Sequence, residues 1–116
     1  MNHILLPQGS SEDRKTRFGV HAMELLINEM MHLGAHRRRM VAKAFGAANV
    51  LTALQRPTVG DLNAAFVREF LAAERIPLIG QRLGGNHALQ VCFRTDTGKA
   101  IVRSVDGSRL PAILED

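Results

Sequence analysis

The groups in this sequence that could carry out covalent chemistry are a single cysteine and five histidines. A cysteine attacks a carbonyl carbon as the thiolate, which a neighbouring imidazole or a helix N-terminus must generate. Cys92 lies within an apolar–polar alternation typical of a strand, and the local sequence supplies neither activating group. We therefore interpret Cys92 as an ordinary strand residue rather than as a nucleophile.

A metal site is suggested by His32 and His36, which are four residues apart and lie near Glu29. Gly34 falls between the two histidines, where the helix is predicted to end, so they should not share one helical face. We therefore expect solvated histidines and no metal ion. His21 lies early in the same helix beside its apolar stripe, and we interpret it as a partly buried, hydrogen-bonded residue.

Two further motifs could bind phosphate or nucleic acid. The stretch "LGGNH" at 83–87 has paired glycines but lacks the lysine and hydroxyl residue of a phosphate-binding loop, so a tight turn is favoured. The run Arg37, Arg38 and Arg39 would form a nucleic-acid patch only if other cations joined it in space, and a solvated loop is the stronger interpretation. Without tryptophan or tyrosine, a base-stacking platform is poorly supported.

Composition narrows the class of protein. A chain of 116 residues with 46% hydrophobic and 22% charged content is typical of one soluble globular domain, spanning 1–116. No apolar run approaches the roughly 20 residues of a membrane-spanning helix, and no signal-peptide pattern opens the chain. We therefore predict a cytoplasmic location, which fits the single cysteine. A net charge of +4 leaves an acidic partner open.

The first elements that must position these groups are a strand and a helix. Residues 3–7, "HILLP", are predicted to end a buried strand, and the polar stretch 8–16 is predicted to be a loop. A helix is predicted over 18–33, with Gly34 as its stop. Its apolar face is formed by Val20, Met23, Leu26, Ile27 and Met30.

A strand and a second helix follow. The stretch 38–46 is predicted to be a strand, while 47–57 could form a loop or a short helix. Thr58 and Asp61 have the spacing of a capping box and begin a helix that continues to about Arg75. The apolar stripe of this helix is formed by Leu62, Ala65, Phe66, Phe70 and Ala73.

The last third of the chain changes to the period of a strand. A short strand is predicted over 76–83, and a β-hairpin over 90–105 because alternating residues flank the turn "TDTG". No structure is predicted for the tail at 106–116. The fold class is therefore α/β, with mixed sheets packed against two main helices.

Longer stretches of the sequence resemble a known family. These are "MNHILLP", "GVHAMELLINEMMHLGAHRRRMVAKAFGAAN", "NAAFVREFLAAERIPLIGQRLGG" and "VCFRTDTGKAIVRSV", which together cover nearly the whole chain in order. They are similar to the CheD family of chemoreceptor glutamine deamidases, and "AMELLINEM" with "FVREFLAAE" is a specific combination.

The resemblance implies an α/β sandwich and a protein-glutamine glutaminase activity, in which receptor glutamine amides are hydrolysed to glutamate and ammonia. It implies a cysteine nucleophile, a histidine partner and a hydroxyl residue that orients the histidine, with no metal or cofactor. The family histidine lies in the "HILLP" segment and carries over onto His3. The implied partners are the cytoplasmic helices of methyl-accepting chemotaxis receptors and, in some members, a CheC-type phosphatase.

The sequence departs from the family pattern at the nucleophile. Family members carry the cysteine and the hydroxyl residue in a glycine-serine-cysteine-like stretch before the histidine motif, and no such stretch precedes His3 here. We therefore expect a CheD-like domain that is incomplete at its N-terminus, with its first strands missing and Cys92 no substitute. Arg75 also stands where glycine is usual, and "FGAAN" replaces a more glycine-rich turn.

Two other functions stay open at this point. A CheD-like domain without its nucleophile could act as a catalytically inactive binding module that docks chemoreceptors or a CheC-type phosphatase. Nucleic-acid binding through Arg37, Arg38 and Arg39 is the weaker alternative.

Overall fold

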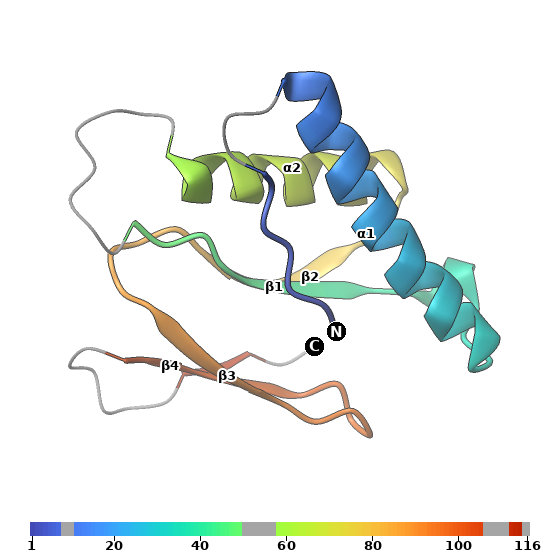
Figure 1. The fold of residues 1–116 in the computed structure, drawn as a ribbon. Helices are drawn as coiled ribbons and strands as arrows, with labels where there is room; N and C mark the ends of the chain where they lie inside the picture. The colour runs from blue at the N-terminus through green and yellow to red at the C-terminus, as the bar shows by residue number, and fades with distance from the viewer. Residues whose placement is uncertain (8–10, 50–57, 106–111, 115–116) are drawn as a thin grey trace.

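The computed structural model describes residues 1–7, 11–49, 58–105 and 112–114, and confirms the mixed α/β class. Three layers are visible in Figure 1: the two helices, a sheet of β1 and β2 beneath them, and a sheet of β3, β4 and β5 on the far side. The elements are α1 (Glu12–His32), η1 (Arg37–Arg39), β1 (Ala42–Gly46), α2 (Val59–Ala73), β2 (Leu78–Leu83), β3 (Leu89–Phe93), β4 (Ala100–Ser104) and β5 (Ala112–Leu114). Among these helices, none has the length and apolar character needed to cross a membrane.

Helix α1 begins earlier than the sequence pattern predicts. Ser11 caps it by accepting a hydrogen bond from the Arg14 backbone N–H at 3.2 Å, and Glu12 and Asp13 favour the positive end of the helix dipole. The predicted loop from Glu12 onward is therefore wrong. The predicted stop is confirmed: Gly34 has φ of 102°, and its N–H bonds the Met31 carbonyl while Ala35 bonds Met30, as in a Schellman motif.

The two helices cross closely over one core. Gly19 of α1 lies against the Phe66 ring of α2, where an added Cβ atom would come within 2.4 Å of a ring carbon. The core below this crossing is formed by Met23, Ile27, Met40, Phe70, Leu71 and Ile76. The predicted stripe of α1 is confirmed at Met23 and Ile27, whereas Met30 near the helix end is exposed.

Helix α2 begins at the predicted capping box. The Thr58 hydroxyl accepts from the Asp61 N–H at 3.1 Å, and the Asp61 carboxylate accepts from the Thr58 N–H at 3.0 Å. Its buried stripe is rotated from the predicted one: Ala65 and Ala73 are exposed, while Ala64 and Leu71 are buried.

Strands β1 and β2 pair in parallel, and α2 forms the connection between them. Strands β3 and β4 form the predicted antiparallel hairpin, with Val91 opposite Val102, and β5 pairs with β4. The two sheets are joined by side chains: Lys43 Nζ donates to the Gly98 carbonyl at 2.6 Å, and Arg82 donates to the Ser104 hydroxyl at 3.1 Å. The predicted loop or helix at 47–57 falls largely outside the described residues, as does most of the predicted tail.

The N-terminal segment, residues 1–7, is not the predicted strand: it makes no strand pairing with the part of the chain that the structure describes. In Figure 1 it runs beside α1 and crosses the view of β1 and β2, with the N-terminus below them. Leu6 is buried and Ile4 packs against the helical core, whereas Leu5 between them is exposed. Burial along Ile4, Leu5 and Leu6 therefore alternates as it would in a strand, but the segment packs on helices instead of joining a backbone ladder.

Candidate functional site

His3 lies on the exposed side of the N-terminal segment. Two hydrogen bonds fix the segment on either side of it. The Asn2 side-chain amide donates to the Ala22 carbonyl of α1 at 3.3 Å, and the Leu6 backbone N–H donates to Asn63 Oδ1 of α2 at 3.1 Å. The imidazole is therefore presented to solvent from a segment that is anchored to both helices.

Cys92 lies on a different layer of the molecule. It pairs with Ile101 across the hairpin, and its side chain is exposed, whereas its neighbours Val91 and Phe93 are partly buried. Those neighbours pair with Ala100 and Val102 and share the inner face with them, and both partners are fully buried. Cys92 consequently projects from the outer face of the hairpin, and it makes no hydrogen bond with His3.

This arrangement supports the interpretation of Cys92 as an ordinary strand residue. A nucleophilic thiol needs a base within hydrogen-bond reach and a place where the reacting carbonyl can sit between them. An exposed strand position on the layer opposite the helices meets neither requirement with respect to His3.

Three other histidines, His21, His32 and His36, are all exposed. His32 is the last residue of α1 and His36 precedes η1, with Gly34 between them, and both are exposed together with Glu29. Within the described ranges, no three histidine, cysteine or acidic residues are grouped so as to hold a metal ion. The predicted partial burial of His21 is wrong: it lies on the solvent side of α1, about 200° around the helix from Met23.

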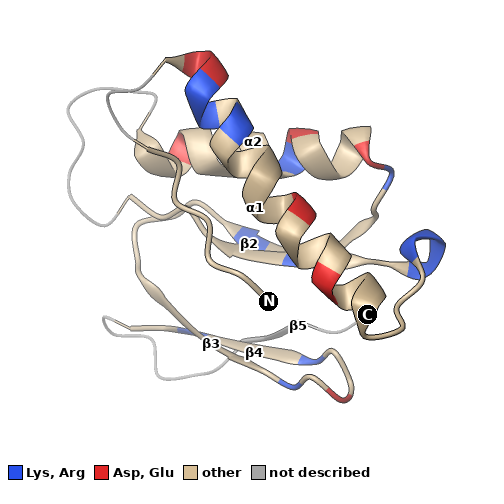
Figure 2. Ribbon diagram, turned by 45° about the vertical axis from the view of Figure 1, so that its right-hand side comes forward, with Lys and Arg blue, Asp and Glu red and all other residues tan. Residues whose placement is uncertain are grey.

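The arginine run forms the short helix η1, at the turn that follows α1 (Figure 2). Arg37 donates to the Glu74 carboxylate at 2.6 Å, and both side chains are substantially exposed. Arg38 and Arg39 are exposed as well, in agreement with a solvated segment. A surface pair of this kind contributes little stability; it joins the segment between α1 and β1 to the end of α2.

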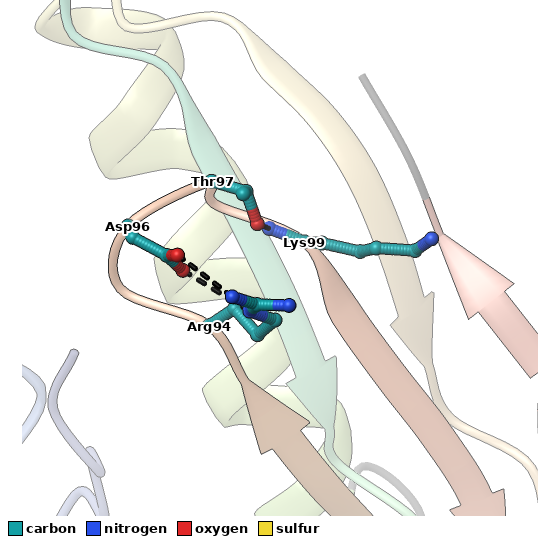
Figure 3. Close-up of polar contacts among 4 residues, drawn as sticks. All are labelled: Arg94, Asp96, Thr97 and Lys99. Atoms are coloured by element: carbon teal, nitrogen blue, oxygen red, sulfur yellow. Dashed lines mark hydrogen bonds and ion pairs between the residues drawn. The ribbon is translucent and has the colours of Figure 1, made fainter.

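Two turns complete the description of the polar residues. Gly84 and Gly85 have φ of 88° and 77°, which confirms a tight turn at "LGGNH". In the hairpin turn, Arg94 contacts the Asp96 carboxylate at 2.7 Å, and the Thr97 hydroxyl accepts from the Lys99 N–H (Figure 3). The Arg94 guanidinium lowers the pKa of Asp96 below its usual 3.8. These contacts shape the turn, and the turn carries no nucleophile.

Sequence reasoning did not identify Asn63. The signal available was an asparagine within a helix, a position that this residue type disfavours because its side chain competes for backbone hydrogen bonds. The structure uses that side chain to hold the segment of His3.

Comparison with known proteins adds a family match. Residues 5–104 match the family described as CheD chemotactic sensory transduction. This range covers both helices and strands β1 to β4, and it begins shortly after His3.

Several curated proteins are similar over most of the chain. "Probable chemoreceptor glutamine deamidase CheD" of Stenotrophomonas maltophilia (strain K279a) is 50% identical over 104 residues, which is 89% of this chain and 52% of the relative. The protein of the same name in Xanthomonas axonopodis pv. citri (strain 306) is 51% identical over the same shares. "CheD 2" of Chromobacterium violaceum is 46% identical over 112 residues, covering 93% of this chain and 56% of the relative. The chain thus spans about half the length of these relatives.

Proposed function

Because the chain belongs to the CheD family, we propose that it acts in the deamidation of chemoreceptors, with His3 as the general base and acid. The substrate is the side-chain amide of a glutamine on a receptor's cytoplasmic helices, which fits a cytoplasmic location, and the products are glutamate and ammonia.

The chemistry assigned to His3 follows from the reactivity of an amide. The imidazole takes the proton of a thiol, the thiolate sulfur bonds to the amide carbon, and the resulting imidazolium protonates the departing ammonia. The imidazole then activates a water molecule, which breaks the thioester and releases the carboxylate and the thiol. No metal or cofactor takes part in these steps.

The thiol in this proposal is not Cys92. In the family the nucleophile belongs to a glycine-serine-cysteine-like stretch before the histidine motif, and the 116 residues do not include that stretch. The exposed position of Cys92 on the outer face of the hairpin supports keeping it out of the reaction.

The observation that carries the proposal is the likeness to proteins named glutamine deamidases, with a family match that covers both helices and strands β1 to β4. The exposed His3 on a segment anchored to those helices supports it. An imidazole in this position can reach a substrate from solvent.

The test uses the protein isolated from its own cells, incubated with the cytoplasmic fragment of a chemoreceptor, and measures released ammonia. We expect His3→Gln to abolish release, and His21→Gln, an exposed histidine of α1, to leave it unchanged. Cys92→Ala should also retain activity. Ammonia release that survives His3→Gln, or that is lost in Cys92→Ala, would contradict the proposal.

A second candidate function is a binding module that docks receptors or a CheC-type phosphatase without catalysis. It is favoured by the position of the chain's single thiol on the layer away from His3. Receptor binding without ammonia release by the wild-type protein would select this function over the first.

A further inference from the structure

We propose that Asn63 is a positioning residue, whose side-chain amide fixes the path of residues 1–7 and thereby the place of the His3 imidazole. The inference deepens the proposed function and rests on it. It adds a residue of α2 to a site that the family likeness and the sequence assign only through His3.

The contact that carries this inference is the hydrogen bond from the Leu6 N–H to Asn63 Oδ1, at 3.1 Å. The Leu6 side chain is buried, so its N–H loses access to water and needs a protein acceptor. Pro7 follows and has no N–H, and a proline holds the residue before it in an extended conformation. The amide of Asn63 therefore accepts from the last backbone donor of residues 1–7, at a residue whose conformation Pro7 already restricts.

Asn63 can act as a fixed reference because α2 is itself held firmly. The capping box of Thr58 and Asp61 fixes the start of the helix one turn earlier, and Gly60 lies so close to the Ala47 carbonyl that a Cβ atom would be 2.6 Å from its oxygen. Phe70 and Leu71, further along, anchor α2 in the core. Because α2 is fixed in the core, a hydrogen-bond acceptor on this helix holds the N-terminal segment at a set position relative to the core.

The type of residue at this position agrees with such a role. Asparagine is a poorer helix former than alanine, and Asn63 lies inside α2 rather than at its cap. A half-buried position in a helix would be filled at lower cost by alanine if only packing mattered. The hydrogen bond to the N-terminal segment explains the asparagine at this position, whereas helix formation does not.

The chemical consequence concerns the distance from the imidazole to its partners. A general base acts only within hydrogen-bond reach of the proton that it takes, and small displacements lower the rate strongly. His3 lies three residues from Leu6 and one residue from Asn2, whose side chain bonds the Ala22 carbonyl. Without the Leu6–Asn63 hydrogen bond, the exposed stretch that carries His3 is held only by the hydrogen bond from Asn2 to the Ala22 carbonyl.

The experiment is nuclear magnetic resonance on the chain, comparing Asn63→Ala, Asn63→Asp and the control Asn28→Ala, at an exposed position of α1. Alanine removes the acceptor while improving helix propensity, and aspartate keeps an acceptor oxygen. We expect amide exchange at Leu6 to become about tenfold faster in Asn63→Ala, the change equivalent to one net hydrogen bond. The His3 ring resonances should move toward those of an unstructured peptide. Asn63→Asp should restore both, and Asn28→Ala should change neither.

Exchange at Leu6 that stays as slow in Asn63→Ala as in the wild type would overturn the inference. So would equal acceleration at the core amides of Met23 and Ile27, because that result reports global unfolding. In the deamidation assay a positioning role predicts a lower kcat with little change in KM, restored by Asn63→Asp. The exchange measurement does not depend on turnover, so a wild-type protein that releases no ammonia would refute the proposed function separately.

Discussion

Residues 3–6 and strand β3 both alternate between exposed and more buried side chains, yet only β3 forms a strand. The partner of β3 follows a short turn, so Phe93 pairs with Ala100 and the backbone ladder closes locally. The N-terminal segment finds its partner 57 residues away, in one side chain of α2. Alternating burial therefore does not by itself make a strand, because the hydrogen-bond partner depends on which segments the fold brings near.

The largest effect should come from breaking the helical support of the N-terminal segment. Gly19→Val places its Cβ atom 2.4 Å from a carbon of the Phe66 ring, so we expect the free energy of unfolding to fall by about 3 kcal/mol. Amide exchange at Leu6 should accelerate as the helices separate. Urea denaturation measures the first effect, and Ala72→Val, on the exposed side of α2, controls for valine in a helix. Equal midpoints for the two variants would refute the close crossing.

A smaller loss should follow from a cavity in the hairpin. Val102 is fully buried, so Val102→Ala should lower the free energy of unfolding by about 2 kcal/mol. Cys92→Ala, on the outer face of the same hairpin, should have little effect on stability. The N-terminal segment is held by the helices and not by the hairpin. Amide exchange at Leu6, measured at urea concentrations below the unfolding transition, should therefore become faster in Gly19→Val than in Val102→Ala.

A gain is expected at a strained position beside the helical layer. Arg75 has φ of 58°, a conformation that costs a residue with a Cβ atom roughly 1 kcal/mol relative to glycine. Arg75→Gly should therefore raise the free energy of unfolding by about 1 kcal/mol, measured as an increase in Tm. Arg38→Gly, at an exposed arginine without positive φ, should give no gain. A lower Tm for Arg75→Gly would show that the side chain makes an essential contact.

The smallest effect concerns the hairpin turn. The pKa of Asp96 is lowered by Arg94, so the folded state favours the ionised carboxylate. The contribution is present above the unfolded carboxyl pKa and is lost as pH falls through the lower folded pKa. Comparing urea midpoints at neutral pH and below 3.8, the wild type should lose slightly more stability than Asp96→Asn. A larger loss in Asp96→Asn would contradict this sign.

Local signals in the sequence were sufficient for much of the fold. Thr58 and Asp61 marked the start of α2, Gly34 marked the end of α1, and "TDTG" marked the hairpin turn, because each acts through hydrogen bonds or backbone conformations within a few residues. The sequence pattern does not predict the start of α1, because a run of polar residues is also typical of a loop. The Ser11 hydroxyl caps the helix, and the carboxylates of Glu12 and Asp13 stabilise its first turn.

The candidate site was less predictable because its contacts are distant in sequence. The placement of His3 depends on the Leu6–Asn63 hydrogen bond, and no periodicity links those residues. The exposure of His21 follows from the face of α1 that is buried, which carries Met23 and Ile27 and leaves His21 on the solvent side. The role proposed for His3 comes from family likeness, since its own sequence neighbourhood is only an apolar stretch.

The most direct test of the account is made in the organism that carries the gene. The codon of His3 is changed to glutamine on the chromosome, with His21→Gln as the matched strain, and receptor peptides from each strain are read by mass spectrometry. We expect receptor glutamines that are glutamate in the wild type and in His21→Gln to remain glutamine in His3→Gln. Receptor glutamate formed equally in all three strains would contradict the assignment of His3 as the base.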